Sequence, residues 1–197
     1  MREFPSGPGF NSRKIKSTVL SSCPRRIRSL ALPHSTDGEA FTVNTEQWAS
    51  FPLLSVKGAY APQLSYTTAD LKAVVAHGRL RGVRVIPEFD VPSHTYPSWD
   101  PVGVRAGNST LLANCSEYPF GFLRVDLDST YDFLGALLED VSKAFPDAVY
   151  NIGGDEMNAA CWNQSAEVAR FMEAQQLNGS ELTGYFTKKL FRVVQDR

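Results

Sequence analysis

The sequence lacks several features that would narrow its function at once. It has no run of about 18 apolar residues, the length that crosses a bilayer as a helix, so we expect no membrane span. Its 20 basic and 21 acidic residues give a formal net charge of -1, which offers no electrostatic reason to expect nucleic acid or an anionic membrane as a partner. Residues 1–22 lack the apolar stretch of a secretory signal, so no signal peptide is visible.

Cysteine is scarce as well, and the three cysteines leave one odd thiol whichever pair forms. What the chain does have is an ordinary globular composition, 43% hydrophobic and 21% charged over 197 residues, enough to bury one core. Asn-x-Ser/Thr motifs are frequent and favour a lumenal or secreted chain. They begin at Asn108, Asn114, Asn163 and Asn178.

The order of elements predicts an α/β fold. Residues 1–40 show no sustained period and are expected to be poorly ordered, so the folded domain is expected over 41–197. Apolar spacing predicts helices over 67–82, 129–147, 165–176 and 180–196, whereas 83–90 and 148–154 have the pattern of buried strands. Residues 91–128 are expected to be loop. This alternation favours a parallel sheet flanked by helices.

Both expected strands end in acidic residues: Glu88 and Asp90 on the first, Asp155 and Glu156 on the second. Functional groups in such folds gather where strands end and loops begin. Two glycines precede the second pair and permit close backbone approach or positive φ, which could turn both carboxylates into one cavity. Two adjacent carboxylates repel, so one can stay protonated while the other is ionised, as acetal hydrolysis requires.

Two other interpretations of these acids stay open on the residues alone. Asp90, His94, Asp155 and Glu156 could ligate a metal ion. Asp155 could instead cap the following helix, with Glu156 favouring its dipole.

Aromatic and cysteine side chains near the acids are similarly ambiguous. Trp99 and Trp162 could stack on a sugar, but a tryptophan is by default a core residue. Cys115 and Cys161 could pair and tie the long loop to the turn after the second strand, or stay reduced in a cytosolic protein.

Two blocks of the sequence resemble a known family. RGVRVIPEFDVPSHTYPSW at 81–99 and NIGGDEMNAACW at 151–162 look like the two signature blocks of family 20 glycoside hydrolases, the β-N-acetylhexosaminidases. FPLLSVKGAY at 51–60 matches too, and the resemblance covers about 51–171. It implies a partial (β/α)₈ TIM barrel, of which this chain holds roughly the third and fourth strands with their helices.

The resemblance also implies an activity and its residues. The family hydrolyses terminal non-reducing N-acetyl-β-hexosamine residues with retention, and the substrate's own acetamide is the nucleophile. Glu156 matches the general acid/base and Asp155 the residue that orients the acetamide. Asp90, His94 and Trp162 match substrate-binding or supporting positions, and Cys115 and Cys161 match a disulfide of lysosomal members.

Further expectations concern cofactors, partners and location. The resemblance implies no metal and no organic cofactor, glycans ending in N-acetylglucosamine or N-acetylgalactosamine as substrates, and a glycoprotein in the lysosome or secreted. A second hexosaminidase subunit is a possible partner.

The sequence departs from the family pattern in ways that bear on activity. Asn151 stands where the family has His, and Ser93 where it has Gly. The family's later strands supply aromatic walls around the acetamide and a Tyr that bonds to it, and neither is found here. We therefore expect impaired turnover by this chain alone, with a non-catalytic truncated isoform or binding partner of a full-length hexosaminidase as the alternative.

Overall fold

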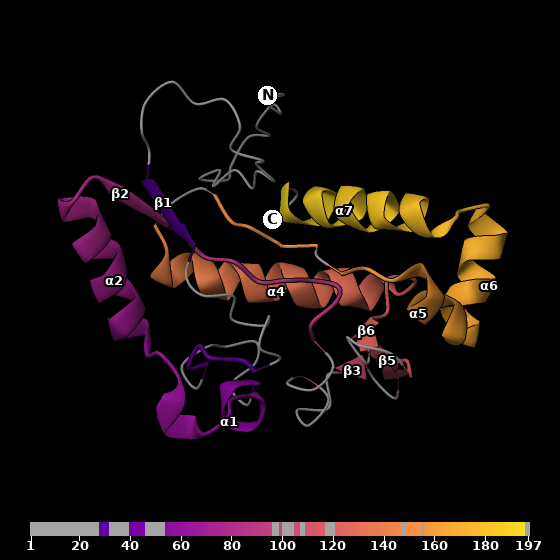
Figure 1. Ribbon diagram of the computed structural model, residues 1–197, viewed down its shortest axis with the longest axis horizontal. Helices are drawn as coiled ribbons and strands as arrows, with labels where there is room; N and C mark the ends of the chain where they lie inside the picture. The colour runs from indigo at the N-terminus through magenta and orange to yellow at the C-terminus, as the bar shows by residue number, and fades with distance from the viewer. Residues whose placement is uncertain are drawn as a thin grey trace.

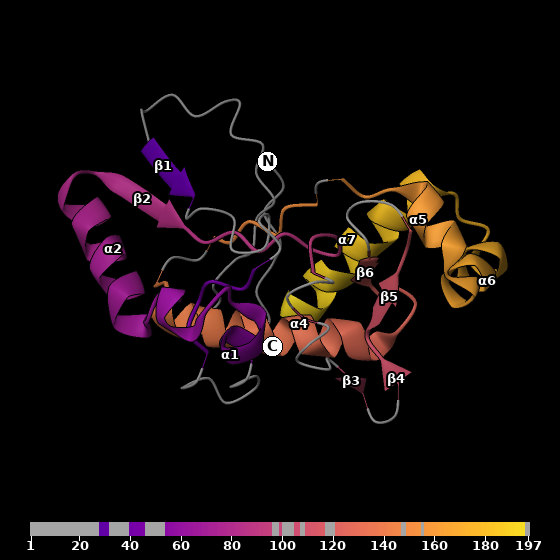
Figure 2. The ribbon, with the colours of Figure 1, turned by 60° about the horizontal axis from the view of Figure 1, so that its bottom comes forward.

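The computed structural model describes residues 28–31, 40–45, 54–95, 99, 105–106, 109–116, 121–146, 149–154 and 156–195. The molecule is elongated, with α4 (Asp128–Ala144) lying lengthwise and α7 (Gly179–Gln195) running beside it (Figure 1). Helix α2 (Thr68–Leu80) with strands β1 (Arg28–Ala31) and β2 (Val83–Ile86) lies at one end, and α5 (Ala159–Gln164) with α6 (Ala166–Gln175) lies at the other (Figure 2).

Three parallel segments form the part of the sheet that carries the candidate residues. Strand β1 pairs with β2 in parallel, with Arg28 opposite Val83. Beyond β2 the chain continues into a parallel bridge between Glu88 and Asn151. The two expected strands at 83–90 and 148–154 are therefore neighbours, although the second is reduced to this bridge and its flanking bonds.

Strand β1 was not expected, because it falls in the segment 1–40 that shows no period. The strand has only four residues and forms by pairing with β2, a contact distant in sequence that the local sequence pattern does not reveal. Most of that segment lies outside the described residues, so the domain boundary at residue 40 stays a prediction.

Helix α2 begins and ends where the sequence predicts. The Thr67 hydroxyl accepts a hydrogen bond from the Asp70 amide at 3.1 Å, and the Asp70 carboxylate accepts one from the Thr67 amide at 2.9 Å, which makes a capping box. Gly82 follows the helix at φ 69°. Gly78 lets the helix lie on β2, because a Cβ there would stand 2.8 Å from Val85 Cγ2.

Two short antiparallel hairpins occupy a region that was expected to be loop. Strand β3 (Arg105–Ala106) pairs with β4 (Ser109–Thr110), and β5 (Leu112–Asn114) pairs with β6 (Gly121–Leu123). Two- and three-residue strands are too short to show a period of two, so the sequence pattern does not reveal them. Residues Leu111, Phe122 and Leu123 are nonetheless buried.

The remaining short helices are α1 (Leu54–Gly58) and the 3₁₀ turn η1 (Pro62–Leu64). The core is continuous from α1 and β2 to α7, and its aromatic centre includes Tyr131 of α4 packed on Phe186 of α7 at 5.8 Å between ring centroids. Among the described residues, no helix combines the length and apolarity that a membrane crossing requires.

Candidate active site

The carboxyl ends of the two neighbouring parallel segments carry most of the candidate residues. The Asn151 amide donates to the Pro87 carbonyl at 2.9 Å, the Phe89 amide to the Asn151 carbonyl at 3.0 Å, and the Val91 amide to the Ile152 carbonyl at 3.0 Å. This ladder places Asp90 directly beside the Gly153–Gly154 turn.

Asp90 is fully buried and is bound by that turn. Its Oδ1 accepts a hydrogen bond from the Gly154 amide at 2.6 Å. A Cβ on Gly153 would stand 2.0 Å from the same oxygen, so no side chain fits at residue 153. Gly153 and Gly154 have φ of 62° and 105°, a region that other residues rarely adopt. The expected close approach and positive φ at these glycines are both confirmed.

His94 connects the buried carboxylate to Glu156. Its Nε2 lies 3.5 Å from Asp90 Oδ2 and 3.4 Å from Glu156 Oε2, and its side chain is almost completely buried. One ring nitrogen thus faces two carboxylates, one beneath it and one at the surface. Both separations are longer than the usual N–H···O hydrogen-bond distance, so an N–H group at Nε2 would interact with the two carboxylates mainly by electrostatic attraction.

Glu156 combines contact with a buried group and access from solution. Its side chain is 57% exposed although one oxygen faces His94. Its φ of 51°, like the 54° of His94, is unusual for a residue with a side chain. Backbone strain of this kind gathers at functional sites. The arrangement suits a carboxyl group that exchanges a proton with a molecule bound from solution.

A second polar pair, Asn151 and Glu88, lies next to the turn, and the sequence did not predict this contact. The Asn151 amide nitrogen donates to the carboxylate of Glu88, which is buried, and Asn151 Oδ1 accepts from the Gly153 amide at 3.1 Å. Asn151 therefore fixes the start of the glycine turn. The acid at Glu88 was visible as a strand-end residue, but its partner could be named only once the two segments were paired.

Two other site predictions have different outcomes. Asp155 lies outside the described residues. Trp162 is 1% exposed and meets Phe122 edge-on at 6.1 Å, so it has no open face on which a sugar could stack. Trp99 is equally buried against Phe133 at 5.3 Å. Both tryptophans lie in the core, which is their default position, and a supporting role for Trp162 stays a prediction.

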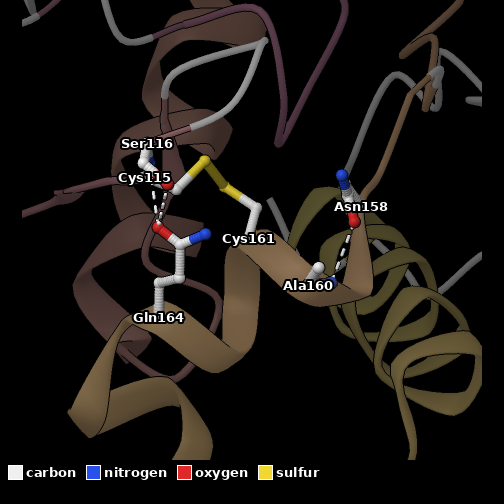
Figure 3. Close-up of a disulfide and its surroundings, with 6 residues drawn as sticks. All are labelled: Cys115, Ser116, Asn158, Ala160, Cys161 and Gln164. Atoms are coloured by element: carbon white, nitrogen blue, oxygen red, sulfur yellow. Dashed lines mark hydrogen bonds between the residues drawn. A yellow bond between two sulfur atoms is a disulfide. The ribbon is translucent and has the colours of Figure 1, made fainter.

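The predicted disulfide between Cys115 and Cys161 is present (Figure 3). It ties the end of the β5 strand to α5, the helix that follows the Glu156 turn. The Ser116 amide and hydroxyl both donate to Gln164 Oε1, at 2.8 and 3.0 Å, and reinforce the same junction. We call Cys115, Ser116, Cys161 and Gln164 the clamp.

The metal interpretation is tested only in part, because Asp155, one of its four candidate ligands, lies outside the described residues. Within the described part of the chain, no three His, Cys, Asp or Glu side chains converge in a way that could hold a metal ion. The residue that caps the following helix, α5, is Asn158 and not Asp155. Asn158 Oδ1 accepts a hydrogen bond from the Ala160 amide at 2.8 Å.

A buried aspartate, a histidine and an exposed glutamate at the ends of parallel strands are the kind of site that α/β hydrolytic enzymes use. A sequence model described as glycosyl hydrolase family 20, catalytic domain, matches residues 25–197, and the chain belongs to this family.

Comparisons with individual proteins agree with this membership. The chain is 36% identical over 173 residues to Beta-hexosaminidase A of Caenorhabditis briggsae, and 37% identical over 168 residues to Beta-hexosaminidase subunit beta of Felis catus. Each alignment covers 82% of this chain and 30% of the relative. The chain thus spans less than a third of the length of these curated relatives.

Solved structures give the fold. The X-ray structure of Flavobacterium johnsoniae chitobiase superposes with a TM-score of 0.67 at 24% identity, covering 86% of this chain and 25% of that one. The Vibrio harveyi exo-β-N-acetylglucosaminidase of the same family, in complex with N-acetylglucosamine, gives 0.61 at 26% identity, covering 84% and 29%. The likeness implies a domain of the TIM-barrel type.

Proposed function

We propose that this chain carries the proton-transfer residues of a β-N-acetylhexosaminidase active site, with Glu156 as general acid/base. The observation that carries the proposal is the placement of Glu156: its carboxylate is open to solution and lies 3.4 Å from a buried histidine backed by a buried aspartate. In this reading, 83–90 and 148–154 are the third and fourth strands of the barrel.

The proposed reaction is substrate-assisted hydrolysis with retention. Glu156 gives its proton to the leaving glycosidic oxygen while the substrate's acetamide oxygen attacks the anomeric carbon and forms an oxazolinium ion. Asp155 orients the acetamide and stabilises its positive charge. Glu156 then takes a proton from the water that opens the ring. His94 and Asp90 are positioning residues: the His94 ring lies next to the Glu156 carboxylate, and Asp90 lies next to the His94 ring.

The proposed substrates are glycans that end in N-acetylglucosamine or N-acetylgalactosamine, and the chemistry needs no metal or organic cofactor. We also propose a lysosomal or secreted glycoprotein as the parent. The disulfide supports that location, because such bonds persist in oxidising compartments.

We further propose that the 197-residue chain turns over slowly by itself, since we identify no counterpart of the family's acetamide-binding walls in it. The alternative is a non-catalytic partner of another hexosaminidase chain. Mammalian relatives named as subunits favour that possibility. Co-purification with a full-length hexosaminidase, without Glu156-dependent activity, would support the partner role.

Two variants separate the proposed roles of the acid pair. We expect Glu156→Gln to lower release of a chromogenic N-acetylglucosaminide by about 10²- to 10⁴-fold, because the proton donor is lost. We expect Asp155→Asn to weaken binding of a thiazoline analogue of N-acetylglucosamine, which mimics the cyclised acetamide, measured as a smaller ligand-induced rise in Tm.

The matched control is Glu173→Gln, an exposed carboxylate of α6 remote in sequence from the acid pair. It should match the unaltered chain in both measurements. Turnover that is unchanged in Glu156→Gln, or analogue binding that is unchanged in Asp155→Asn, would contradict the corresponding role. Loss of binding on treatment with a chelator would favour the metal-dependent alternative.

A further inference from the structure

We propose that Asn178 is an N-glycan acceptor, in the turn between α6 and α7. The acceptor motif is Asn178–Gly179–Ser180, and the side chains of Asn178 and Ser180 are both exposed. Helix α6 ends at Gln175, and the φ of 55° at the next residue, Gln176, reverses the chain into this turn. An exposed turn is the setting in which an attached glycan meets no part of the fold.

The hydrogen bonds of Asn178 leave the reacting atom available. Its Oδ1 accepts from the Glu181 amide at 3.0 Å, and its own backbone amide donates to Glu181 Oε2 at 2.8 Å. Asn178 therefore caps α7 through its oxygen. The atom that carries an N-glycan is the other one, Nδ2.

The transfer step is compatible with this cap. Nδ2 attacks the anomeric carbon of a lipid-pyrophosphate-linked oligosaccharide, a C–N bond forms, the carbon–oxygen bond to the pyrophosphate breaks, and Nδ2 loses one proton. The product amide keeps Oδ1 as an acceptor. The helix cap and the glycan can thus coexist on one side chain.

Two other glycan-acceptor motifs include residues of the clamp. The motif at Asn114 contains Cys115 and Ser116, and the motif at Asn163 contains Gln164 and Ser165. Cys115 is joined to Cys161, and Ser116 is bonded to Gln164 (Figure 3). Ser165 is buried and caps α6 by accepting from the Val168 amide at 3.4 Å. Closing the clamp therefore competes with access to both motifs. Asn108 lies outside the described residues.

The turn at Asn178 is fixed in position by its neighbour. A Cβ on Gly179 would stand 2.3 Å from the Cβ of Ala159, so the turn packs closely on the first residue of α5. Gly179 faces inward while Asn178 and Ser180 remain exposed. The disulfide independently indicates the oxidising compartment in which N-glycans are added.

The test is expression of the full chain in eukaryotic cells behind an added secretion signal, with peptide-level mass spectrometry after enzymatic removal of N-glycans in ¹⁸O water. We expect the isotope label on residue 178. The same measurement on cell extract serves if the chain is retained in the cell. The readout is a mass and does not depend on the proposed activity.

Two variants separate the glycan from the cap. Asn178→Asp and Ser180→Ala should each remove one glycan's mass, and both keep a capping side chain at residue 178. Asn163→Asp, the matched control at an exposed asparagine of α5, should leave the glycan on residue 178 in place. An unlabelled residue 178, with or without label at another motif, would overturn the proposal.

Discussion

At the scale of single residues, the geometry of the site depends on the contact between Gly153 and Asp90. The glycine turn passes so close to the carboxylate that it donates the Gly154 amide to it, and Asp90 in turn faces the ring nitrogen that lies near Glu156. Asn151 supports the same turn through the Gly153 amide. The exposed acid is thus linked through His94 and Asp90 to the backbone of the glycine turn.

We expect Gly153→Ala to destabilise the protein by more than about 2 kcal/mol, because a positive φ and a clash with Asp90 act together. Gly82→Ala isolates the first effect, since residue 82 has φ 69° but nothing within 4 Å of an added Cβ; it should cost about 1–2 kcal/mol.

Gly184→Ala, at an exposed and open position within α7, should stabilise by about 0.5–1 kcal/mol. Urea unfolding followed by circular dichroism measures all three changes. Equal costs at residues 153 and 82 would show that the contact with Asp90 contributes nothing.

At the scale of elements, the long helices were predictable and the short pieces were not. Thr67 and Gly82 bound α2 in the sequence as they do in the structure, and α4 ends at Ala144, just before Phe145 and Pro146. Helix α5 has six residues, and the strands of the two hairpins have two or three residues each, too few for a period to emerge. Their positions depend on contacts distant in sequence, such as the bonds from Ser116 to Gln164.

The contact between α4 and α7 also has an electrostatic part. Lys189 of α7 donates to Asp128, at the start of α4, and its ammonium lies 4.4 Å from the centre of the Tyr131 ring. The hydrogen bond from Lys189 holds the pKa of Asp128 below its usual range. Burial raises the pKa of the Tyr131 hydroxyl, which donates to the Val125 carbonyl at 2.6 Å.

The disulfide between Cys115 and Cys161 can be tested by counting reactive thiols. We expect one reactive thiol per chain in denaturant without reductant and three after reduction, because two of the three cysteines are paired. Cys161→Ser should lower the free energy of unfolding by about 2–4 kcal/mol, since the bond closes a long loop of the unfolded chain. Three reactive thiols before reduction would contradict the pairing.

At the scale of the whole molecule, the paired segments 87–91 and 151–152 join the two ends of the elongated fold. Their parallel pairing could be predicted from the alternation of helices and strands, and the described acids Glu88, Asp90 and Glu156 lie at the ends of these segments as predicted. The contacts among Asp90, His94 and Glu156 could not be predicted. They depend on left-handed backbone at His94 and Glu156, which no sequence pattern indicates.

We expect the amide hydrogens of Phe89, Val91 and Asn151 to be among the slowest to exchange with deuterium, because each donates to the neighbouring segment. The amide of Asp70, held by an exposed cap, should exchange much faster. Hydrogen exchange read by mass spectrometry or NMR compares them directly. Faster exchange at the three central amides than at Asp70 would show that the paired segments do not hold the molecule together.

The bond between Cys115 and Cys161 has a practical consequence for anyone who handles this protein. A protease that cuts the backbone once between those two residues leaves two peptides that are still covalently joined. Such nicked material would migrate as a single band on a gel run without reductant and would separate only when the sulfur link is broken. Integrity of a preparation should therefore be judged on reduced samples.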